Sequence, residues 1–401
     1  MAGADTQLAP DANDSFVVSD DPTDPDDSPF VARYKQHTRF ATQLKAQDMK
    51  GRTSWGDRVS VTFDRTGDLV HRCMVGATIT KGFGTAWYPM EALFSSIQLW
   101  FGGVLLEEHT PDWMRVYDEM YRAPDERQSY KAITNFRAED SIGTTKTLYL
   151  PLLFWWCRDP SRALRLVSLE HHDIELVLTL ATSVQGVDMS RPPILTFTTD
   201  YLFLDAPERS LLLRKPATQL VQVLERHEVD MRQDLPLHRI RLPFKDHCAS
   251  LIWCCTGEAH GAFTTSGKPL EHDEQYAPVR SAQLIIAGTE RLSSRFGTWH
   301  RVVEPFLKNV RAPSAGVYSF FPSARPGDAE EPSGSLDLGA FDDATLVLEL
   351  KSPAIGAPGN DDTLAQGTHP LTRLVIFAQT WKKLHMQDGK ATVTSLSSFE
   401  R

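Results

Sequence analysis

The residues best suited to bind a metal ion stand together at Glu170, His171, His172 and Asp173. Imidazole and carboxylate groups are common zinc ligands. A strand-like segment, Asp173 to Leu180, begins at this cluster, and neighbouring residues of a strand point to opposite faces of a sheet. His171 and His172 therefore cannot easily share one ion. We interpret the cluster as a polar strand start near the rim of a β-sandwich, and we predict no metal site.

No other motif predicts catalysis or cofactor binding. Gly82-Phe83-Gly84 resembles the start of a dinucleotide-binding loop, but Trp87 stands where the third glycine is needed. The phosphate-binding, zinc-protease and serine-hydrolase motifs do not occur in the sequence. The acidic run Asp20 to Asp27 lacks the spacing and closing glutamate of a calcium-binding EF-hand, so calcium is only a weak alternative there. We predict a protein that is not an enzyme and has no cofactor.

The nine tryptophans could stack against a carbohydrate. Four of them lie within apolar runs and are predicted to be core: Trp100, Trp155, Trp156 and Trp253. The other five remain candidates for an exposed surface: Trp55, Trp87, Trp113, Trp299 and Trp381. A β-sandwich carbohydrate-binding module is therefore one alternative function.

Charge is distributed unevenly along the 401 residues. Residues 1–28 contain eight aspartates and no Lys, Arg or Glu, which predicts a disordered acidic arm. A sharper alternative is an arm that becomes ordered against a basic partner. Without those eight, 44 acidic residues remain against 42 basic ones, so the rest of the chain is nearly neutral. A neutral body argues against direct binding of nucleic acid, which needs a concentrated basic face.

Five cysteines occur without any Cys-x-x-Cys spacing: Cys73, Cys157, Cys248, Cys254 and Cys255. Most lie in apolar runs, so we predict reduced, structural thiols and folding in a reducing compartment of the cytosolic type. We also expect no secretory signal, no membrane-spanning segment, and no glycosylation at the Asn13-Asp14-Ser15 sequon.

The central stretch Thr147 to Leu180 has the strongest core signal. It holds two apolar, strand-like runs, Leu148 to Cys157 and Asp173 to Leu180, separated by Arg158 to Ser161. Phe154, Trp155 and Trp156 follow one another, and consecutive residues of a strand alternate between its faces. We therefore expect a strand that is covered on both faces, as in a β-sandwich.

Further strands are predicted on both sides of this stretch. In the first half they are two strands around a turn at Arg65–Asp68 (within 60–79), a hairpin over 97–106 around Gly102-Gly103, and 194–204. In the second half they are 220–229, 240–242, 250–255, 282–287, 316–321, 344–350, 374–377 and 391–396. Short helices are predicted at 113–121 and 299–307, and polar loops at 256–279, 322–343 and 352–369.

Two successive sets of roughly eight short strands are typical of two jelly rolls. The predicted fold is all-β: two tandem eight-stranded antiparallel jelly rolls with short helices in loops. We place the acidic arm at residues 1–28, the first jelly roll at 29–212 and the second at 213–401, with the break between Pro207 and Gln219.

Several segments resemble the major capsid proteins of the nucleocytoplasmic large DNA viruses of eukaryotes. The central LPLLFWWCRDPSRALRLVSLEHHDIEL (Leu150–Leu176) is similar to a segment of that family, and other pieces match in the same order from residue 29 onward. The signature positions are Gly67, Asp68, Leu69, Phe154, Trp155, Trp156, Asp205, Glu208, Arg209, Pro332, Ser333 and Gly334. The chain departs from the family pattern at Asp337, Gly339 and Trp381.

The resemblance implies a double jelly roll whose homotrimers form pseudo-hexagonal capsomers of an icosahedral shell. The implied location is the virion. Implied partners are further copies of the chain, neighbouring capsomers, minor capsid and penton proteins, and internal membrane-associated proteins contacted by the acidic arm. A minor or divergent capsid protein is the alternative within the same family.

Overall fold

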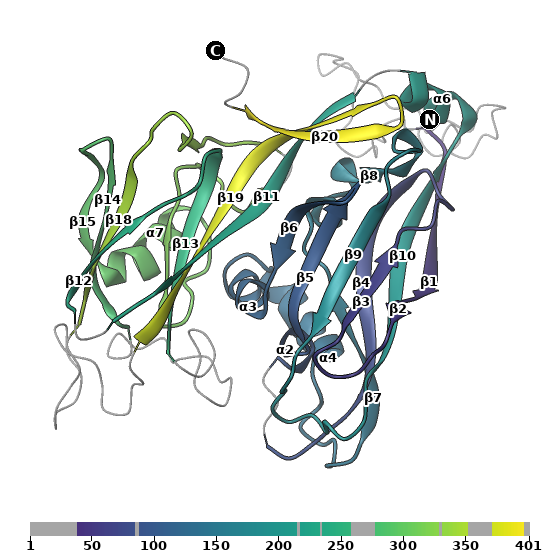
Figure 1. Ribbon diagram of the computed structural model, residues 1–401, viewed down its shortest axis with the longest axis horizontal. Helices are drawn as coiled ribbons and strands as arrows, with labels where there is room; N and C mark the ends of the chain where they lie inside the picture. The colour runs from purple at the N-terminus through teal and green to yellow at the C-terminus, as the bar shows by residue number, and fades with distance from the viewer. Residues whose placement is uncertain are drawn as a thin grey trace, which may run out of the picture.

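The computed structural model describes residues 38–84, 88–214, 217–232, 235–257, 277–328, 331–351 and 371–396. The predicted acidic arm, Trp87 and most of the predicted loops 256–279 and 352–369 lie outside the described residues. Figure 1 shows two β-rich halves side by side, which we name the N-terminal roll (residues 38–214) and the C-terminal roll (residues 217–396).

The N-terminal roll is built from two antiparallel sheets. The β1 sheet has the order β1 (Phe40–Asp48), β10 (Ile194–Leu204), β4 (Leu69–Thr80), β7 (Thr145–Pro151), with β8 (Leu164–Arg165) also pairing with β4. The β3 sheet has the order β2 (Lys50–Gly51), β3 (Arg58–Thr62), β9 (Ile174–Leu180), β5 (Phe94–Phe101), β6 (Val104–His109).

The C-terminal roll repeats this arrangement. The β11 sheet has the order β11 (Ala217–Asp230), β19 (Leu371–Gln387), β13 (His247–Gly257), β16 (Val317–Phe320), with β17 (Leu336–Asp337) and β20 (Lys390–Ser395) added. The β12 sheet has the order β12 (Leu237–Arg241), β18 (Ala344–Leu350), β14 (Val279–Ile286), β15 (Thr289–Phe296). In both halves the first and last long strands pair, which confirms the predicted double jelly roll.

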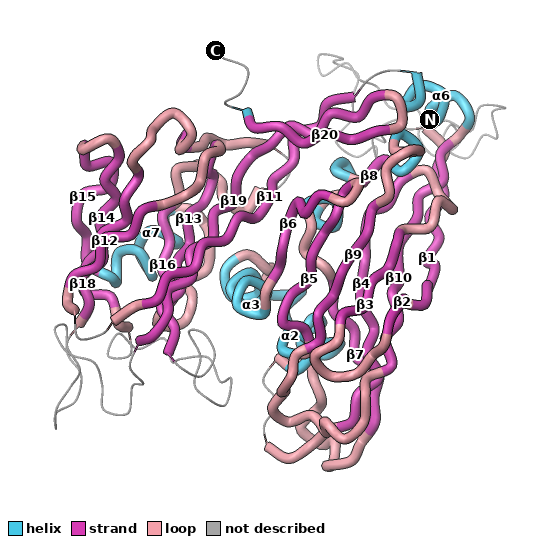
Figure 2. The backbone as a smooth tube through the Cα atoms, in the orientation of Figure 1, coloured by secondary structure: helices cyan, strands magenta, loops and turns pink. Residues whose placement is uncertain are grey.

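Short helices lie in the connections, as Figure 2 shows. They are α2 (Pro89–Ala92), α3 (Pro111–Met120), α4 (Pro124–Thr134), α5 (Trp155–Arg158), α6 (Ala206–Arg214), α7 (Glu304–Leu307), the 3₁₀ turns η1 (Pro160–Arg162) and η2 (Leu166–Ser168), and the π-helical turn η4 (Trp299–Val303). Helix α3 confirms the prediction at 113–121, and η4 with α7 confirms that at 299–307. No helix among the described residues is long and apolar enough to cross a membrane.

A single apolar interior continues from the N-terminal roll to the outer face of the β11 sheet. Along β19, Leu374 and Ile376 point into the C-terminal roll, whereas Val375 and Phe377 belong to the N-terminal cluster. Strand β13 alternates in the same way, with Trp253 inside its own roll and Ile252 facing the neighbouring one. Because both faces of these strands are buried, they read as nearly continuous apolar runs in the sequence.

Two sequence-based expectations of local structure were wrong. Phe154–Trp156 do not form a strand: β7 ends at Pro151, and the aromatic residues lie at a bend and in α5. Their side chains are nevertheless fully buried, because the bend directs them into the apolar cluster of the N-terminal roll. The strands flanking Arg65–Asp68 also do not form a hairpin, since β3 and β4 belong to opposite sheets and the segment crosses between them.

Cysteines and tryptophans show how far composition predicted burial. All five cysteines are free thiols, and four of them are buried. Trp113 and Trp381, which we expected to be surface candidates, are buried at 0% and 2% exposure. Trp113 packs on Phe377 of β19, and Trp381 is itself a residue of β19, so the burial of both depends on residues far away in the sequence. Trp55 and Trp299 are half-buried, and so is Trp100, which we expected in the core.

Candidate functional site

Helix α3 lies between the two rolls and carries the first group of contacts between them (Figure 1). Asp112 at its start pairs with Arg373 of β19 at 3.1 Å, and Arg373 also pairs with Glu228 of β11 at 3.1 Å. At the next residue, the Trp113 ring lies 5.3 Å from that of Phe377, centroid to centroid. The helix is therefore fixed to the β11 sheet by charge at its end and by aromatic packing along its length.

Strand β6 forms a second contact, made by a buried carboxylate. Oε1 of Glu107 accepts the backbone N–H of Leu224 in β11 at 3.1 Å and a hydrogen bond from Nε2 of His109 at 2.8 Å. Glu107 and His109 are 2% and 1% exposed. The His109 ring in turn stacks on Phe154 at 4.5 Å. A charge buried this deeply needs its hydrogen bonds to be kept, so this group strongly constrains how the rolls meet.

The end of α3 holds the loop that precedes β16. Oε2 of Glu119 accepts hydrogen bonds from the backbone N–H and the hydroxyl of Ser314, each at 2.9 Å. The backbone N–H of Arg311 donates to the carbonyl of Met120 at 3.3 Å, and its guanidinium donates to the carbonyl of Asp118. These bonds extend the junction along the whole helix.

The Glu170–Asp173 cluster also belongs to this junction. The backbone N–H of His171 donates to the carbonyl of Gly389 at 2.8 Å, and Nδ1 of His172 accepts the N–H of Ala391 at 3.1 Å. Gly389 and Ala391 lie at the β19–β20 turn of the other roll. Among the described residues, no group of three or more His, Cys, Asp or Glu side chains could hold a metal. The two histidines instead connect the rolls.

Four of the signature positions meet at one end of the N-terminal roll. Asp68 pairs through Oδ1 with Nε of Arg209 at 3.1 Å, and its Oδ2 accepts the N–H of Leu204 at 2.9 Å. Asp205 caps α6 by accepting the N–H of Glu208 at 3.0 Å, and Glu208 accepts the hydroxyl of Thr38. Asp68 stands more than a hundred positions before the other three residues, but the fold joins the start of β4 to α6.

Gly67 and Leu69 flank that aspartate. A Cβ atom on Gly67 would lie 2.8 Å from Cβ of Tyr201, so the position has no room for a side chain. Leu69 begins β4 and pairs with Leu202 of β10. The Gly-Asp-Leu segment therefore serves close packing of the backbone on β10.

The aromatic signature residues form a stacked cluster in the N-terminal roll, at and just before helix α5. Phe154 and Trp156 stack at 5.0 Å, and Trp155 stands edge-on to Trp156 at 4.7 Å. Nδ1 of His71 donates to the carbonyl of Trp156 at 2.8 Å. Next to the cluster, Arg158 donates to Oε1 of Gln222 in β11 at 2.6 Å. The cluster thus supports the contact between rolls from the N-terminal side.

Pro332, Ser333 and Gly334 lie in a loop of the C-terminal roll. The hydroxyl of Ser333 accepts the N–H of Arg325 at 2.8 Å and donates to the carbonyl of the same residue at 3.1 Å. The N–H of Ala324 donates to the carbonyl of Ser333 at 2.9 Å. Gly334 has a φ of +116°, which suits only glycine. The segment therefore closes its own loop.

A buried ionic group lies among helices α2, α3 and α4 and was not indicated by any motif. Asp118 pairs with Arg122 at 3.2 Å and with Arg127 at 3.1 Å. The Tyr130 hydroxyl donates to Glu91, and burial raises the pKa of the Glu91 carboxyl above its usual value. Every member has an intramolecular partner, so we interpret the group as structural.

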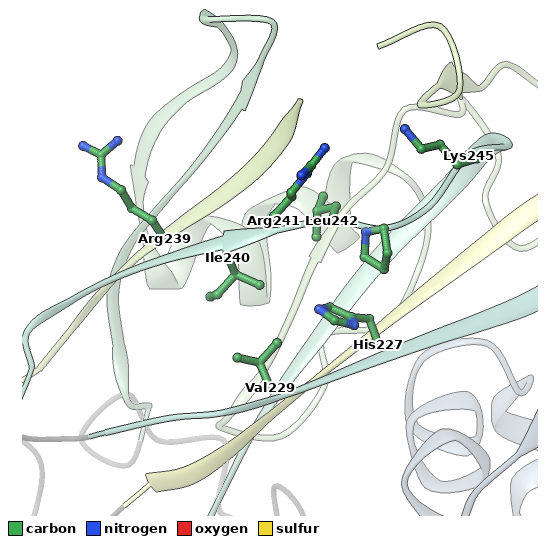
Figure 3. Close-up of a pocket in the computed structure, with 8 residues that line it drawn as sticks. His227, Val229, Arg239, Ile240, Arg241, Leu242 and Lys245 are labelled. Atoms are coloured by element: carbon green, nitrogen blue, oxygen red, sulfur yellow. The ribbon is translucent and has the colours of Figure 1, made fainter. Parts of the chain in front are cut away.

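Each roll has a groove between its two sheets. The larger, about 570 Å³, lies between β11 and β12, and Figure 3 shows Val229 and Ile240 pointing into it while Arg239 and Arg241 point from the opposite face of β12. The smaller, about 440 Å³, occupies the equivalent place between β1 and β3. The lining of the larger groove is apolar with a basic rim, and that of the smaller groove is mixed.

Comparisons with known proteins agree with this architecture. The major capsid protein of Paramecium bursaria Chlorella virus 1 is 29% identical over 97% of this chain and 98% of its own length. That of Pyramimonas orientalis virus is 26% identical over 80% and 86%. A chain of the quasi-atomic model of the PBCV-1 virus capsid superposes with a TM-score of 0.84 at 28% identity, covering 91% of this chain and 99% of that one.

Family assignments divide at the same place as the rolls. Residues 28–205 match the family described as major capsid protein N-terminus. Residues 208–392 match the large eukaryotic DNA virus major capsid protein. The chain therefore belongs to the major capsid protein family of the large eukaryotic DNA viruses.

Proposed function

We propose that this major capsid protein acts as a homotrimer, and that each trimer is a pseudo-hexagonal capsomer of an icosahedral shell. The observation that carries the proposal is the equivalent order of the four main strands of each sheet in the two rolls. Three copies of a chain with two equivalent rolls present six similar corners, so a threefold particle can fill a sixfold lattice position.

The domain boundaries follow from the same proposal. We assign residues 29–212 to the first jelly roll, residues 213–401 to the second, and residues 1–28 to an arm outside them. The signature positions are assigned structural roles: Gly67, Asp68, Leu69, Asp205, Glu208 and Arg209 at the β4–α6 end, Phe154, Trp155 and Trp156 beneath the junction, and Pro332, Ser333 and Gly334 in their loop. The contacts described above support each of these roles.

The partners of the chain are first of all other copies of itself. Neighbouring capsomers, minor capsid proteins and penton proteins complete the shell, and the eight aspartates of the arm contact internal membrane-associated proteins. The protein is structural, without a catalytic role, and its place is the virion. Support comes from its relatives, which are capsid proteins.

The test is to express the full chain and measure its mass in solution by light scattering after gel filtration. The expected result is a trimer that negative-stain images show as a particle with a hexagonal outline. A chain that stays monomeric over a wide range of concentration and salt would overturn the proposal. Copy number in purified virions separates a major from a minor shell protein.

A further inference from the structure

Within one chain, the junction joins two defined surfaces. One consists of strand β6 and the helix that follows it, α3. The other is the outer face of the β11 sheet. Glu107 bonds to Leu224 across this junction, and Trp113 packs on Phe377. The end strand of one roll and its following helix are thus seated on the sheet face of the other roll.

The repeated topology gives every chain a second, unused copy of both surfaces. In strand order, β15 of the C-terminal roll is equivalent to β6, and η4 with α7 follows β15 as α3 follows β6. We name β15, η4 and α7 together (residues 289–307) the helix-side surface. The β1 sheet is equivalent to the β11 sheet, and we name its outer face the sheet-side surface.

The sheet-side surface is apolar for a face that no described element covers. Inward residues such as Phe197 and Tyr201 are buried, so their alternates on β10 point outward. Leu44, Ile194 and Tyr149 are outward residues that are 64%, 67% and 39% exposed. One row across the four strands carries no charge at all: Ala46, Thr198, Met74 and Pro151. Most outward residues of this face are uncharged, with Asp48, Arg72 and Asp200 as exceptions, and its exposed apolar side chains are suited to contact a partner.

Among the described residues of its roll, the helix-side surface carries the most exposed aromatic side chains. Phe296 at the end of β15 is 74% exposed, and Phe306 and Leu307 of α7 are 76% and 59% exposed. In the equivalent helix α3, Trp113 and Val116 are buried at 0% and 1%. The apolar side chains that α3 buries at the junction therefore have exposed counterparts at the other end of the chain.

We infer that the helix-side surface of one copy packs on the sheet-side surface of the next copy, repeating between chains the junction seen within each chain. The occupant of each surface is a second copy of this protein. Such a head-to-tail contact closes into a ring when the rotation permits, and rolls that alternate around a pseudo-sixfold axis close after three chains. The inference rests on the proposed trimer and assigns its contacts.

The first test places a charge in each surface of the full-length chain, by Phe306→Glu and Ile194→Glu. Matched controls are Phe83→Glu and Ile142→Glu, at side chains that are 84% and 56% exposed and lie outside both surfaces. We expect the two interface variants to weaken trimer formation by roughly 30-fold or more, because a charge opposite an apolar partner loses hydration. The controls should form trimers as the unaltered chain does. The readout is sedimentation velocity over a dilution series.

The second test measures direction by cross-linking with a flexible bis-maleimide. The double variant Ile194→Cys with Phe306→Cys should give covalent dimers and trimers, whereas either single variant should match the background of the five native cysteines. Efficient cross-linking of a single variant would indicate a self-complementary contact and overturn the inference.

The outcomes separate the two proposals. If the unaltered chain forms trimers and the interface variants do so equally well, the assigned surfaces are wrong while the trimer stands. If the unaltered chain never forms trimers, the proposed function itself fails.

Discussion

Asp68 and Arg209 form an ion pair at 3.1 Å that joins the start of β4 to helix α6. The two partners differ in exposure, since the Asp68 side chain is 11% exposed and that of Arg209 is 58% exposed. Asp68 also accepts the N–H of Leu204. The pair therefore combines a partly buried hydrogen bond with a solvent-screened charge contact, and the two parts can be separated by mutation.

Asp68→Ala should destabilise the protein by about 1–3 kcal/mol, because it leaves the N–H of Leu204 without an acceptor. Arg209→Ala should cost less than about 1 kcal/mol, since an exposed partner is screened by water and salt. Thermal unfolding at one protein concentration compares the two variants. Equal losses would show that the charge contact dominates over the backbone hydrogen bond.

Gly67→Ala should destabilise by about 1–3 kcal/mol, because the new methyl group would lie 2.8 Å from Cβ of Tyr201. The matched control is Gly327→Ala, where the nearest atom, Cδ1 of Tyr121, is at an ordinary contact distance of 3.6 Å. Urea denaturation of both variants provides the measurement. A Gly67 variant as stable as the control would mean that β4 shifts without cost.

Glu107→Ala should weaken the coupling between the two rolls. It leaves the N–H of Leu224 and the imidazole of His109 without their buried acceptor, at a cost of about 3–5 kcal/mol. In scanning calorimetry the variant should unfold in two separated transitions, one for each roll. An exposed carboxylate of the N-terminal roll, Glu139→Ala, is the control and should keep the unaltered profile.

Stability should fall as the pH falls from about 6.5 to about 4, through His300. Burial lowers the pKa of this imidazole to about 4, and the nearby Arg295 adds to the shift. The unfolded chain therefore takes up the proton first, so folded stability is lost on acidification through this window. His300→Asn keeps a donor for the Ser319 carbonyl and cannot titrate. The unfolding midpoint of this variant should vary less with pH than that of the unaltered chain. An equal pH dependence would mean that groups other than His300 cause the loss of stability.

Glu91 makes folding stability depend on pH in the opposite direction. Burial raises its pKa in the folded protein above the usual value, so the folded state binds the proton more tightly than the unfolded state. Its contribution to stability is therefore lost as pH rises through the folded pKa. Glu91→Gln, which stays neutral, should gain stability over the unaltered chain with increasing pH. A constant difference across the range would contradict a raised pKa.

Local patterns predicted those elements that local residues determine. The β5–β6 hairpin follows from Gly102 and Gly103, which both have positive φ. Helix α3 follows from the spacing of Trp113, Val116 and Met120, which are all buried. The two successive sets of strands predicted two tandem jelly rolls, and the family resemblance implied the same fold.

Other features depend on residues far away in the sequence. Strand β15 was not predicted because its residues are mostly exposed and do not alternate; it exists because β14 pairs with it. The bond from Leu224 to Glu107 spans 117 positions, so neither residue signals the other. Phe154–Trp156 were misassigned as a strand because burial on several sides can also be achieved at a bend.

Val375 and Phe377 face the N-terminal roll while Leu374 and Ile376 line the C-terminal roll, so strand β19 contributes to two separate apolar clusters, one on each of its faces. Rotating one half against the other would expose to water the apolar residues on the outer face of the β11 sheet, so each copy is a rigid unit. The changes of angle that a closed shell requires must then occur at the contacts between copies.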